Sequence, residues 1–318
     1  MKTLRLGYLS TMYHTSHLIK NLGWLETGLG VKTAWTLFGT GPAMVKAFQE
    51  DRLDIGYIGL PPAMIGIGQG LPLKCVAGGH AEGTVMIGRQ DITPFSVSGS
   101  VREVLLQFRG KRVGAPSAGS IHDVIARFLV RQNGLKDISI VNYAWADLIP
   151  DAIQSGDICG AFGTPPLAVV ADTWFSFPIV LPASEIWPFN PSYGIVATEK
   201  MLKAKQLLKG FIRLHEKACN MIISFPERAA EVIAAEIKVV DRRFVQKVLS
   251  VSPCYCAALP PEYINATMAF LPALKNMNYI KRDLSEKTVF DFSYIRALHP
   301  EPHHYNTPLN TPILDEPC

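Results

Sequence analysis

Short apolar runs alternate with stretches of helical periodicity through the first two thirds of the chain. The runs predict strands at 4–9, 33–38, 54–58, 74–77, 112–115, 138–143, 159–162 and 179–181. The spacing of apolar residues between them predicts helices at 16–25, 42–50, 121–133 and 149–155. Strands that alternate with helices in this way indicate βαβ units and a mainly parallel sheet, here in two successive sets.

Two further apolar runs, 84–88 and 193–198, stand at the borders of the second set. We expect the chain to cross between two lobes at these runs. Lobe one would consist of residues 1–83 plus 194–318, and lobe two of residues 84–193. Beyond residue 200 the periodicity predicts helices at 201–224, 226–238, 241–249 and 261–276. The Pro-rich tail, 298–318, is expected to be an extended surface wrap or a partly disordered end.

Composition narrows the class of protein. Hydrophobic residues make up 48% of the 318 residues and charged residues 18%, which is typical of a well-buried globular chain and not of a disordered one. The charge of +4, from 31 Lys+Arg and 27 Asp+Glu, comes without a basic cluster, so we expect no nucleic-acid partner. The N-terminus lacks the apolar segment of a signal peptide, so we expect a cytoplasmic protein or one whose leader has been removed.

A turn rich in small residues or in Gly-Pro follows each of six predicted strands. These turns are 10–15, 39–42, 59–62, 78–80, 116–120 and 163–166. In open parallel sheets, ligands bind beyond the carboxyl ends of the strands, where helix N-termini present free N–H groups. All six turns would therefore face one crevice. The ligand-binding residues we expect there are His14, Thr15, Gly41, Pro61, His80, Ser117, Ser120, Asp147, Thr164 and Tyr193.

Several of these residues have a second interpretation. Ser117 and Ser120 are suited to hold an anion at a helix start, but either serine is equally suited to cap that helix. Asp147 could accept a hydrogen bond from the amine of a zwitterionic ligand, or simply begin a helix. The two histidines, His14 and His80, are expected to form hydrogen bonds in the crevice or to local backbone groups.

Neither enzymatic nor cofactor chemistry is predicted. The P-loop ending Gly-Lys-Ser/Thr and the Gly-x-Gly-x-x-Gly fingerprint are missing, so we expect no nucleotide cofactor, and the nucleophile-elbow pattern Gly-x-Ser-x-Gly is also absent. Cys254 and Cys256 are expected to be structural. A zinc shell around them would need His299, His303 or His304 from the tail. We therefore expect no metal site.

Three segments carry a resemblance to a known family. Gly-Thr-Gly-Pro-Ala-Met-Val-Lys-Ala-Phe at 39–48, Leu-Asp-Ile-Gly-Tyr-Ile-Gly at 53–59 and Gly-Ser-Ile-His-Asp-Val at 119–124 resemble the solute-binding proteins of nitrate/sulfonate/taurine-type ABC importers. The resemblance covers roughly residues 3–297. It implies an α/β type II periplasmic-binding-protein fold, with two lobes and a crevice between them, and a monomer that delivers a small polar or anionic solute to a membrane permease by hinge closure.

Two features depart from that family. Its transport members carry a leader peptide, and none is recognised here. The Cys-Tyr-Cys at 254–256 and the His/Pro-rich tail resemble the related branch that contains the yeast-type enzyme that makes the pyrimidine of thiamine. The cysteine run of that enzyme and its pyridoxal phosphate lysine have no counterpart in this sequence. The alternatives are therefore a cytoplasmic biosynthetic enzyme of that type, with an aminopyrimidine-like ligand, or a cytoplasmic ligand sensor on the same fold.

Overall fold

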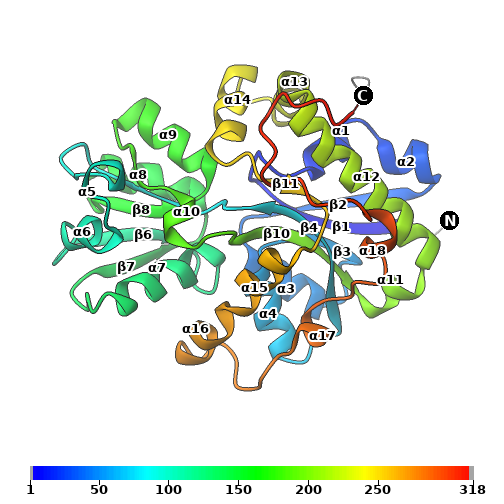
Figure 1. Ribbon diagram of the computed structural model, residues 1–318, viewed down its shortest axis with the longest axis horizontal. Coiled ribbons are helices and arrows are strands. Elements are labelled where there is room, and N and C mark those ends of the chain that lie inside the picture. The colour runs from blue at the N-terminus through cyan, green and yellow to red at the C-terminus, as the bar shows by residue number, and fades with distance from the viewer. Residues whose placement is uncertain (1–2, 315–318) are drawn as a thin grey trace.

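Two separate β-sheets organise the chain in the computed structural model, which describes residues 3–314 (Figure 1). The first sheet has the strand order β11-β4-β10-β3-β1-β2. Its strands are β1 (Thr3–Leu9), β2 (Lys32–Phe38), β3 (Ile55–Ile58), β4 (Leu73–Ala81), β10 (Pro191–Thr198) and β11 (Tyr255–Cys256). Strands β1, β2 and β3 are parallel, whereas β10 runs antiparallel to both β3 and β4. The parallel half is therefore the half built from βα units.

The second sheet has the order β7-β6-β8-β5-β9. Its strands are β5 (Val85–Gly88), β6 (Arg112–Pro116), β7 (Ser139–Tyr143), β8 (Gly160–Gly163) and β9 (Ile179–Leu181). Strand β6 pairs in parallel with β7 and β8, and β5 is antiparallel to β8. The chain leaves the first sheet after β4 and returns to it with β10. We refer to the elements on the first sheet as lobe one and to those on the second as lobe two.

Helices cover both sheets. Lobe one is covered by α1 (Ser16–Asn21), α2 (Trp24–Leu29), α3 (Gly41–Gln49), α4 (Leu60–Gly68), α11 (Glu199–Lys203), α12 (Lys205–Ser224), α13 (Pro226–Ile237), α14 (Arg242–Val251), α15 (Pro261–Met268), α16 (Phe270–Asn276), α17 (Glu286–Val289) and α18 (Ile295–Leu298). Lobe two carries α5 (Phe95–Ser98), α6 (Val101–Leu106), α7 (Ile121–Gln132), the 3-10 turn η1 (Ala146–Leu148), α8 (Ile149–Gln154), α9 (Pro165–Phe175) and α10 (Ala183–Ile186). No helix within residues 3–314 is long and apolar enough to cross a membrane.

The ten predicted strand runs, including the two crossing runs, fall on strands, but several helices differ from expectation. The helix predicted over 16–25 is broken at Gly23, whose φ of 61° is left-handed and ends the first helical segment. The helix predicted over 201–224 is divided at Ala204 into α11 and α12. Helices α4 and α9 were predicted only as turns. Their Pro-Pro pairs lie in the first turn, where a missing N–H breaks no helical hydrogen bond.

The C-terminal segment, residues 299–314, runs along lobe one as an extended wrap (red in Figure 1). Tyr305 is almost fully buried, and its hydroxyl oxygen accepts from the Gly79 N–H at 3.2 Å and donates to the Ala258 carbonyl at 3.0 Å. Further on, the Asn310 N–H donates to the Ile223 carbonyl at 2.7 Å. Residues 299–314 thus form the extended wrap, the first of the two expected alternatives for the tail. Residues 315–318 lie outside the described part of the chain.

Candidate functional site

A cavity of about 50 Å³ lies between the two lobes. It opens where β1, β2 and β3 of lobe one and β6 and β8 of lobe two reach their carboxyl ends. The residues that line it are Leu9, Ser10, Thr11, Tyr13, Gly39, Thr40, Gly41, Gly59, Pro62, Pro116, Ser120, Ile121, His122, Ala146, Thr164 and Ser192. This is the position in which open α/β sheets bind ligands, because the strand ends leave a crevice there.

Four helix N-termini, two from each lobe, meet at the cavity. Helices α3, α4, α7 and α9 begin directly after N-cap residues Thr40, Gly59, Ser120 and Thr164, and all four caps line the cavity wall. In the first turn of a helix the N–H groups lack intrahelical partners, and the helix dipole gives that end a partial positive charge. The prolines in the first turns of α3, α4 and α9 have no N–H, and the N–H groups of Ala43, Asp123 and Leu167 donate to the caps. The first-turn N–H groups that remain are those of Gly41, Leu60, Ile121 and His122. The helices start at these positions because Thr, Ser and Gly are favoured as N-caps, and because Pro in the first turn, as in α3, α4 and α9, is favoured at a helix start. The cavity therefore favours negative charge.

The side chains of the cavity are neutral. Among the described residues that line it, none is Lys, Arg, Asp or Glu. Burial lowers the pKa of His122 to about 4, so its ring is uncharged at neutral pH, and its Nδ1 lies 2.9 Å from the hydroxyl of Thr84. Burial likewise raises the pKa of Tyr13 to about 12, although its hydrogen bond with the Ser192 hydroxyl, at 2.9 Å, acts in the opposite direction. The polar groups on offer are hydroxyls and backbone N–H groups.

One of these hydroxyls has no partner in the protein. The Oγ1 atom of Thr11 is buried and makes no hydrogen bond, although Thr11 lines the cavity. Buried hydroxyls are normally hydrogen-bonded, since leaving one unpaired costs free energy. By contrast, Ser120 Oγ accepts from the Asp123 N–H at 3.2 Å and so is partly used as a helix cap. Thr11 is thus the hydroxyl most available to a bound group.

Close contact between the lobes at the cavity rim depends on a glycine. A β carbon at Gly39 would come within 2.4 Å of the indole ring of Trp145, which reaches over from the loop between β7 and η1. Such a distance is far inside van der Waals contact, so only glycine permits this approach. The absence of a side chain at Gly39 therefore allows the two lobes to approach each other this closely.

Three of the ten expected ligand-binding residues line the cavity, namely Gly41, Ser120 and Thr164. Five others each stand one position away from a residue that does so. These are His14 beside Tyr13, Pro61 beside Pro62, Ser117 beside Pro116, Asp147 beside Ala146, and Tyr193 beside Ser192. Asp147 is exposed on η1. Cavity residues absent from our expectation include Thr11 and Ser192. Each carries a hydroxyl close in sequence to a residue that we chose, Thr11 three positions before His14 and Ser192 directly before Tyr193.

The remaining expected residues belong to a buried polar cluster beneath the cavity or to its edge. The hydroxyl of Thr15 contacts Nδ1 of His215 at 2.8 Å and accepts from the hydroxyl of Tyr193 at 3.2 Å. Nε2 of His80 lies 2.6 Å from the carbonyl of Ser252. The ring of His14 packs against that of Tyr193 at a tilt of 37°, with 4.0 Å between the ring centres, and neither of its ring nitrogens has a hydrogen-bond partner. These residues support the cavity floor.

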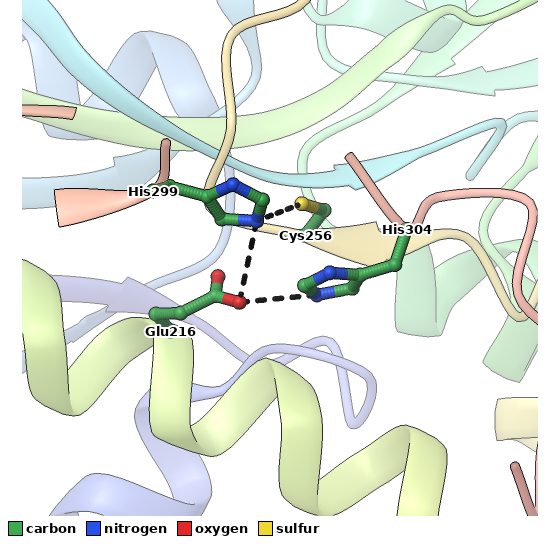
Figure 2. A group of neighbouring side chains, drawn as sticks. All are labelled: Glu216, Cys256, His299 and His304. Atoms are coloured by element: carbon green, nitrogen blue, oxygen red, sulfur yellow. Dashed lines mark hydrogen bonds and ion pairs between the residues drawn. The ribbon is translucent and has the colours of Figure 1, made fainter. Parts of the chain in front are cut away.

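Ser117 precedes α7 in the turn that contains Ser120, but it does not line the cavity. Its hydroxyl oxygen is buried and makes no hydrogen bond. Side chains suited to hold a metal ion gather elsewhere, around Cys256 (Figure 2).

Solved structures with the same arrangement are solute-binding proteins. The alkanesulfonate-binding protein SsuA of Xanthomonas axonopodis pv. citri, bound to MOPS, is 16% identical, with a TM-score of 0.77, over 91% of this chain and 98% of that one. The periplasmic aliphatic sulphonate-binding protein SsuA of Escherichia coli is 17% identical, with a TM-score of 0.76, over 93% and 98%. The periplasmic nitrate-binding protein NrtA of Synechocystis PCC 6803 is 12% identical, with a TM-score of 0.74, over 94% and 88%.

These structural likenesses establish the two-lobed fold of periplasmic solute-binding proteins that the sequence resemblance implied. A comparison with curated protein sequences finds no match. The model of the NMT1-like family matches residues 1–238, which is most of the chain and includes every element that lines the cavity. By its sequence and its fold, the chain belongs to the NMT1-like family.

Proposed function

We propose that this chain is the solute-binding component of an ABC importer and that it captures a small anion between its lobes. The observation that carries the proposal is the meeting of four helix N-termini, two from each lobe, at a cavity whose described lining has no charged side chain. Helix N-termini bind anions through free N–H groups and the helix dipole. The similar solved proteins named for sulfonate and nitrate binding support the same class of ligand.

In this proposal the bound oxyanion receives hydrogen bonds from both lobes. Lobe one contributes the Gly41 N–H at the start of α3, the Leu60 N–H at the start of α4 and the hydroxyl of Thr11. Lobe two contributes the N–H groups of Ile121 and His122 at the start of α7. Helix α9 contributes its dipole alone, because it begins with two prolines and the Leu167 N–H donates to Thr164. Each helix end carries a charge of roughly +0.5, so four of them balance an anion without a cationic side chain.

The size of the space favours a small anionic group with room for an organic tail. The cavity of about 50 Å³ is several times the roughly 10–15 Å³ that one water molecule needs. An adjoining hollow of about 300 Å³ shares Pro62 with the cavity and is also lined by Ala118, Gly119 and Lys46. An oxyanion head in the cavity and a tail in the hollow would suit a sulfonate or taurine, and the head alone would suit nitrate.

Hinge closure would couple binding to transport. A ligand that touches both lobes favours the closed form by its differential affinity for that form. We place the hinge crossings at the junctions of residues 1–83, 84–193 and 194–318, although β10 of the first sheet already begins at Pro191. The closed monomer would then be presented to a membrane permease on the outer side of the membrane, with catalysis playing no part.

The test is a binding panel on the purified chain. Isothermal titration calorimetry with nitrate, methanesulfonate, taurine and a neutral aminopyrimidine measures affinity, and small-angle scattering measures the radius of gyration with and without the tightest ligand. We expect an anion to bind tightest and to reduce the radius of gyration. Tightest binding by the neutral aminopyrimidine would overturn the proposal and favour the biosynthetic alternative. Anion binding without closure would contradict the hinge.

A further inference from the structure

Four side chains with metal-ligating atoms converge at one point in lobe one, away from the cavity (Figure 2). Glu216 comes from α12, Cys256 from β11, His299 from the end of α18, and His304 from the C-terminal wrap. One ligand atom of each residue lies within 4.8 Å of all the others. Four elements, of which only the last two are close in the sequence, thus place one sulfur, two nitrogens and one oxygen around a common centre.

Three of the six separations within the cluster are close to those around a four-coordinate metal. Sγ of Cys256 lies 3.2 Å from Nε2 of His299. Oε1 of Glu216 lies 3.6 Å from Nε2 of His299 and 3.1 Å from Nε2 of His304. Bonds of about 2.0–2.3 Å at tetrahedral angles would hold such atoms roughly 3.3–3.6 Å apart. These three edges of the tetrahedron therefore need adjustments of only a few tenths of an ångström.

Two of the inward-facing atoms have no hydrogen-bond partner. Oε1 of Glu216 and Nε2 of His304 are both buried and lie 3.1 Å apart as an ion pair, but their geometry is not that of a hydrogen bond. Their side chains are only 13% and 11% exposed, so solvent reaches them poorly. A buried carboxylate oxygen and an imidazole nitrogen that face each other in this way are stabilised when one cation serves both, either a proton on the ring or a metal ion between them.

Neighbouring groups hold the side chains of the cluster in place. Oε2 of Glu216 accepts from the Ala257 N–H at 2.8 Å, and Sγ of Cys256 accepts from the Ala258 N–H at 3.4 Å. Nδ1 of His299 lies 3.0 Å from the Glu301 carbonyl. Because a carbonyl only accepts, Nδ1 carries the proton, and the lone pair of Nε2 faces the centre. Such outer hydrogen bonds orient the ligands of protein metal sites.

The arrangement does not suit a thiol catalyst. In a Cys-His-acid arrangement the acid orients the ring nitrogen that faces away from the nucleophile. Here Glu216 lies against Nε2, the same nitrogen that faces Cys256, while Nδ1 of His299 is taken by a backbone carbonyl. Both Cys256 and His299 are buried, so a substrate has no access to the thiol. Ligation is the chemistry that remains.

We propose that Glu216, Cys256, His299 and His304 bind one Zn²⁺ ion that fastens the C-terminal wrap to lobe one. Sulfur and imidazole ligands select zinc over magnesium or calcium, and four protein ligands close the shell as in structural zinc sites. Tyr305, the residue after His304, continues the attachment by its bonds to Gly79 and Ala258. The inference does not depend on the transport function, and it replaces our sequence-based expectation of no metal site.

The sequence-based expectation failed to anticipate this cluster for a definite reason. It required the tail histidines to reach the Cys-Tyr-Cys segment, and the structure brings His299 and His304 there. Cys254, the other cysteine of that segment, takes no part, and its place is filled by Glu216 from α12. The spacing of two cysteines in the sequence was therefore a poor guide to the ligand set.

The first test uses the untagged full-length chain. After dialysis against a chelator, the protein is titrated with Zn²⁺ in competition with a chromophoric chelator, and bound metal is counted by plasma mass spectrometry. We expect one Zn²⁺ per chain with a dissociation constant below about 1 μM. Co²⁺ in its place should show tetrahedral d–d bands and a thiolate charge-transfer band. A chain that takes up neither metal at one equivalent overturns the proposal.

Neighbouring residues of the same types provide matched controls. Cys256→Ser and His304→Ala should each weaken Zn²⁺ binding by about 100-fold or more, because ligands matter at least as much as their outer partners. Cys254→Ser and His303→Ala should leave it unchanged, since neither residue belongs to the cluster. If a ligand variant fails to fold, the conservative Glu216→Gln takes its place. Equal losses in the control and ligand variants would contradict the assignment.

Discussion

Thr11→Val separates ligand binding from stability at the interlobe cavity. Valine has nearly the shape of threonine and removes only the hydroxyl, which is buried, lines the cavity and has no partner in the protein. The backbone role of the residue remains, because its carbonyl continues to accept from the His14 N–H at 3.3 Å and to contact Nε2 of His17 at 3.0 Å. The change should therefore act on the ligand and hardly on the fold.

The expected magnitudes follow from that geometry. A hydrogen bond to a charged group contributes about 1.5–3 kcal/mol, so losing one should weaken anion binding roughly 10- to 150-fold. The free energy of unfolding without ligand should change by less than about 1 kcal/mol, because no protein hydrogen bond is lost. A substitution at most binding-site residues lowers both the ligand affinity and the free energy of unfolding. At Thr11 we expect the affinity to fall and the free energy of unfolding to stay nearly the same.

Titration calorimetry with the tightest-binding anion of the panel and urea unfolding without ligand measure the two quantities. Thr173→Val, on the exposed side of α9, is the control and should leave the affinity unchanged. An unchanged affinity for Thr11→Val would refute the role of this hydroxyl. A loss of stability above about 2 kcal/mol would show that the hydroxyl serves the fold instead.

Three further outcomes are expected. Ser120→Ala should weaken anion binding and also lower the free energy of unfolding by about 0.5–2 kcal/mol, because Ser120 caps α7 through the Asp123 N–H; urea unfolding that matches the wild type would contradict this. Gly39→Ala should hold the lobes apart by its clash with Trp145, giving a larger radius of gyration with ligand, and Trp145→Ala should restore closure. Burial holds the pKa of His122 at about 4, so its ring stays neutral from pH 5 to 8 and anion affinity should be flat over that range. A rise in affinity as the pH falls through 6.5 would show that His122 titrates in the site.

The turns of the site were predictable because their chemistry is local. A strand that ends in Gly, Thr or Ser and is followed by Pro or an apolar residue predicts a βα junction wherever it occurs, as at Thr40 and Thr164. Such junctions of parallel strands meet at one edge of a sheet, so the sequence alone indicated an anion-binding crevice. It could not show that Pro61 and Pro165 begin true helices, since turns and helix starts share the same signals.

The side chains that face the cavity were decided by tertiary structure. Successive residues of a strand point to opposite faces. A prediction that is wrong by one position therefore selects a side chain in the core in place of one in the cavity. This is the case in β10, where Ser192 lines the cavity and Tyr193 is buried beneath it. His14 was selected for its chemistry, but the loop after β1 turns the neighbouring Tyr13 toward the cavity.

The Glu216, Cys256, His299 and His304 cluster shows where the sequence reached its limit: the pattern named Cys256 and the tail histidines, but not Glu216, and it could not show that the four side chains meet. Its members are separated by up to 88 residues, from 216 to 304, and belong to a helix, a strand, a helix end and a tail. No periodicity relates such positions. The sequence by itself determined the alternation of strands and helices and the turns at the strand ends, because these depend on neighbouring residues. Only the packing of the whole chain decided which side chains meet, because contacts between distant segments depend on every element that lies between them.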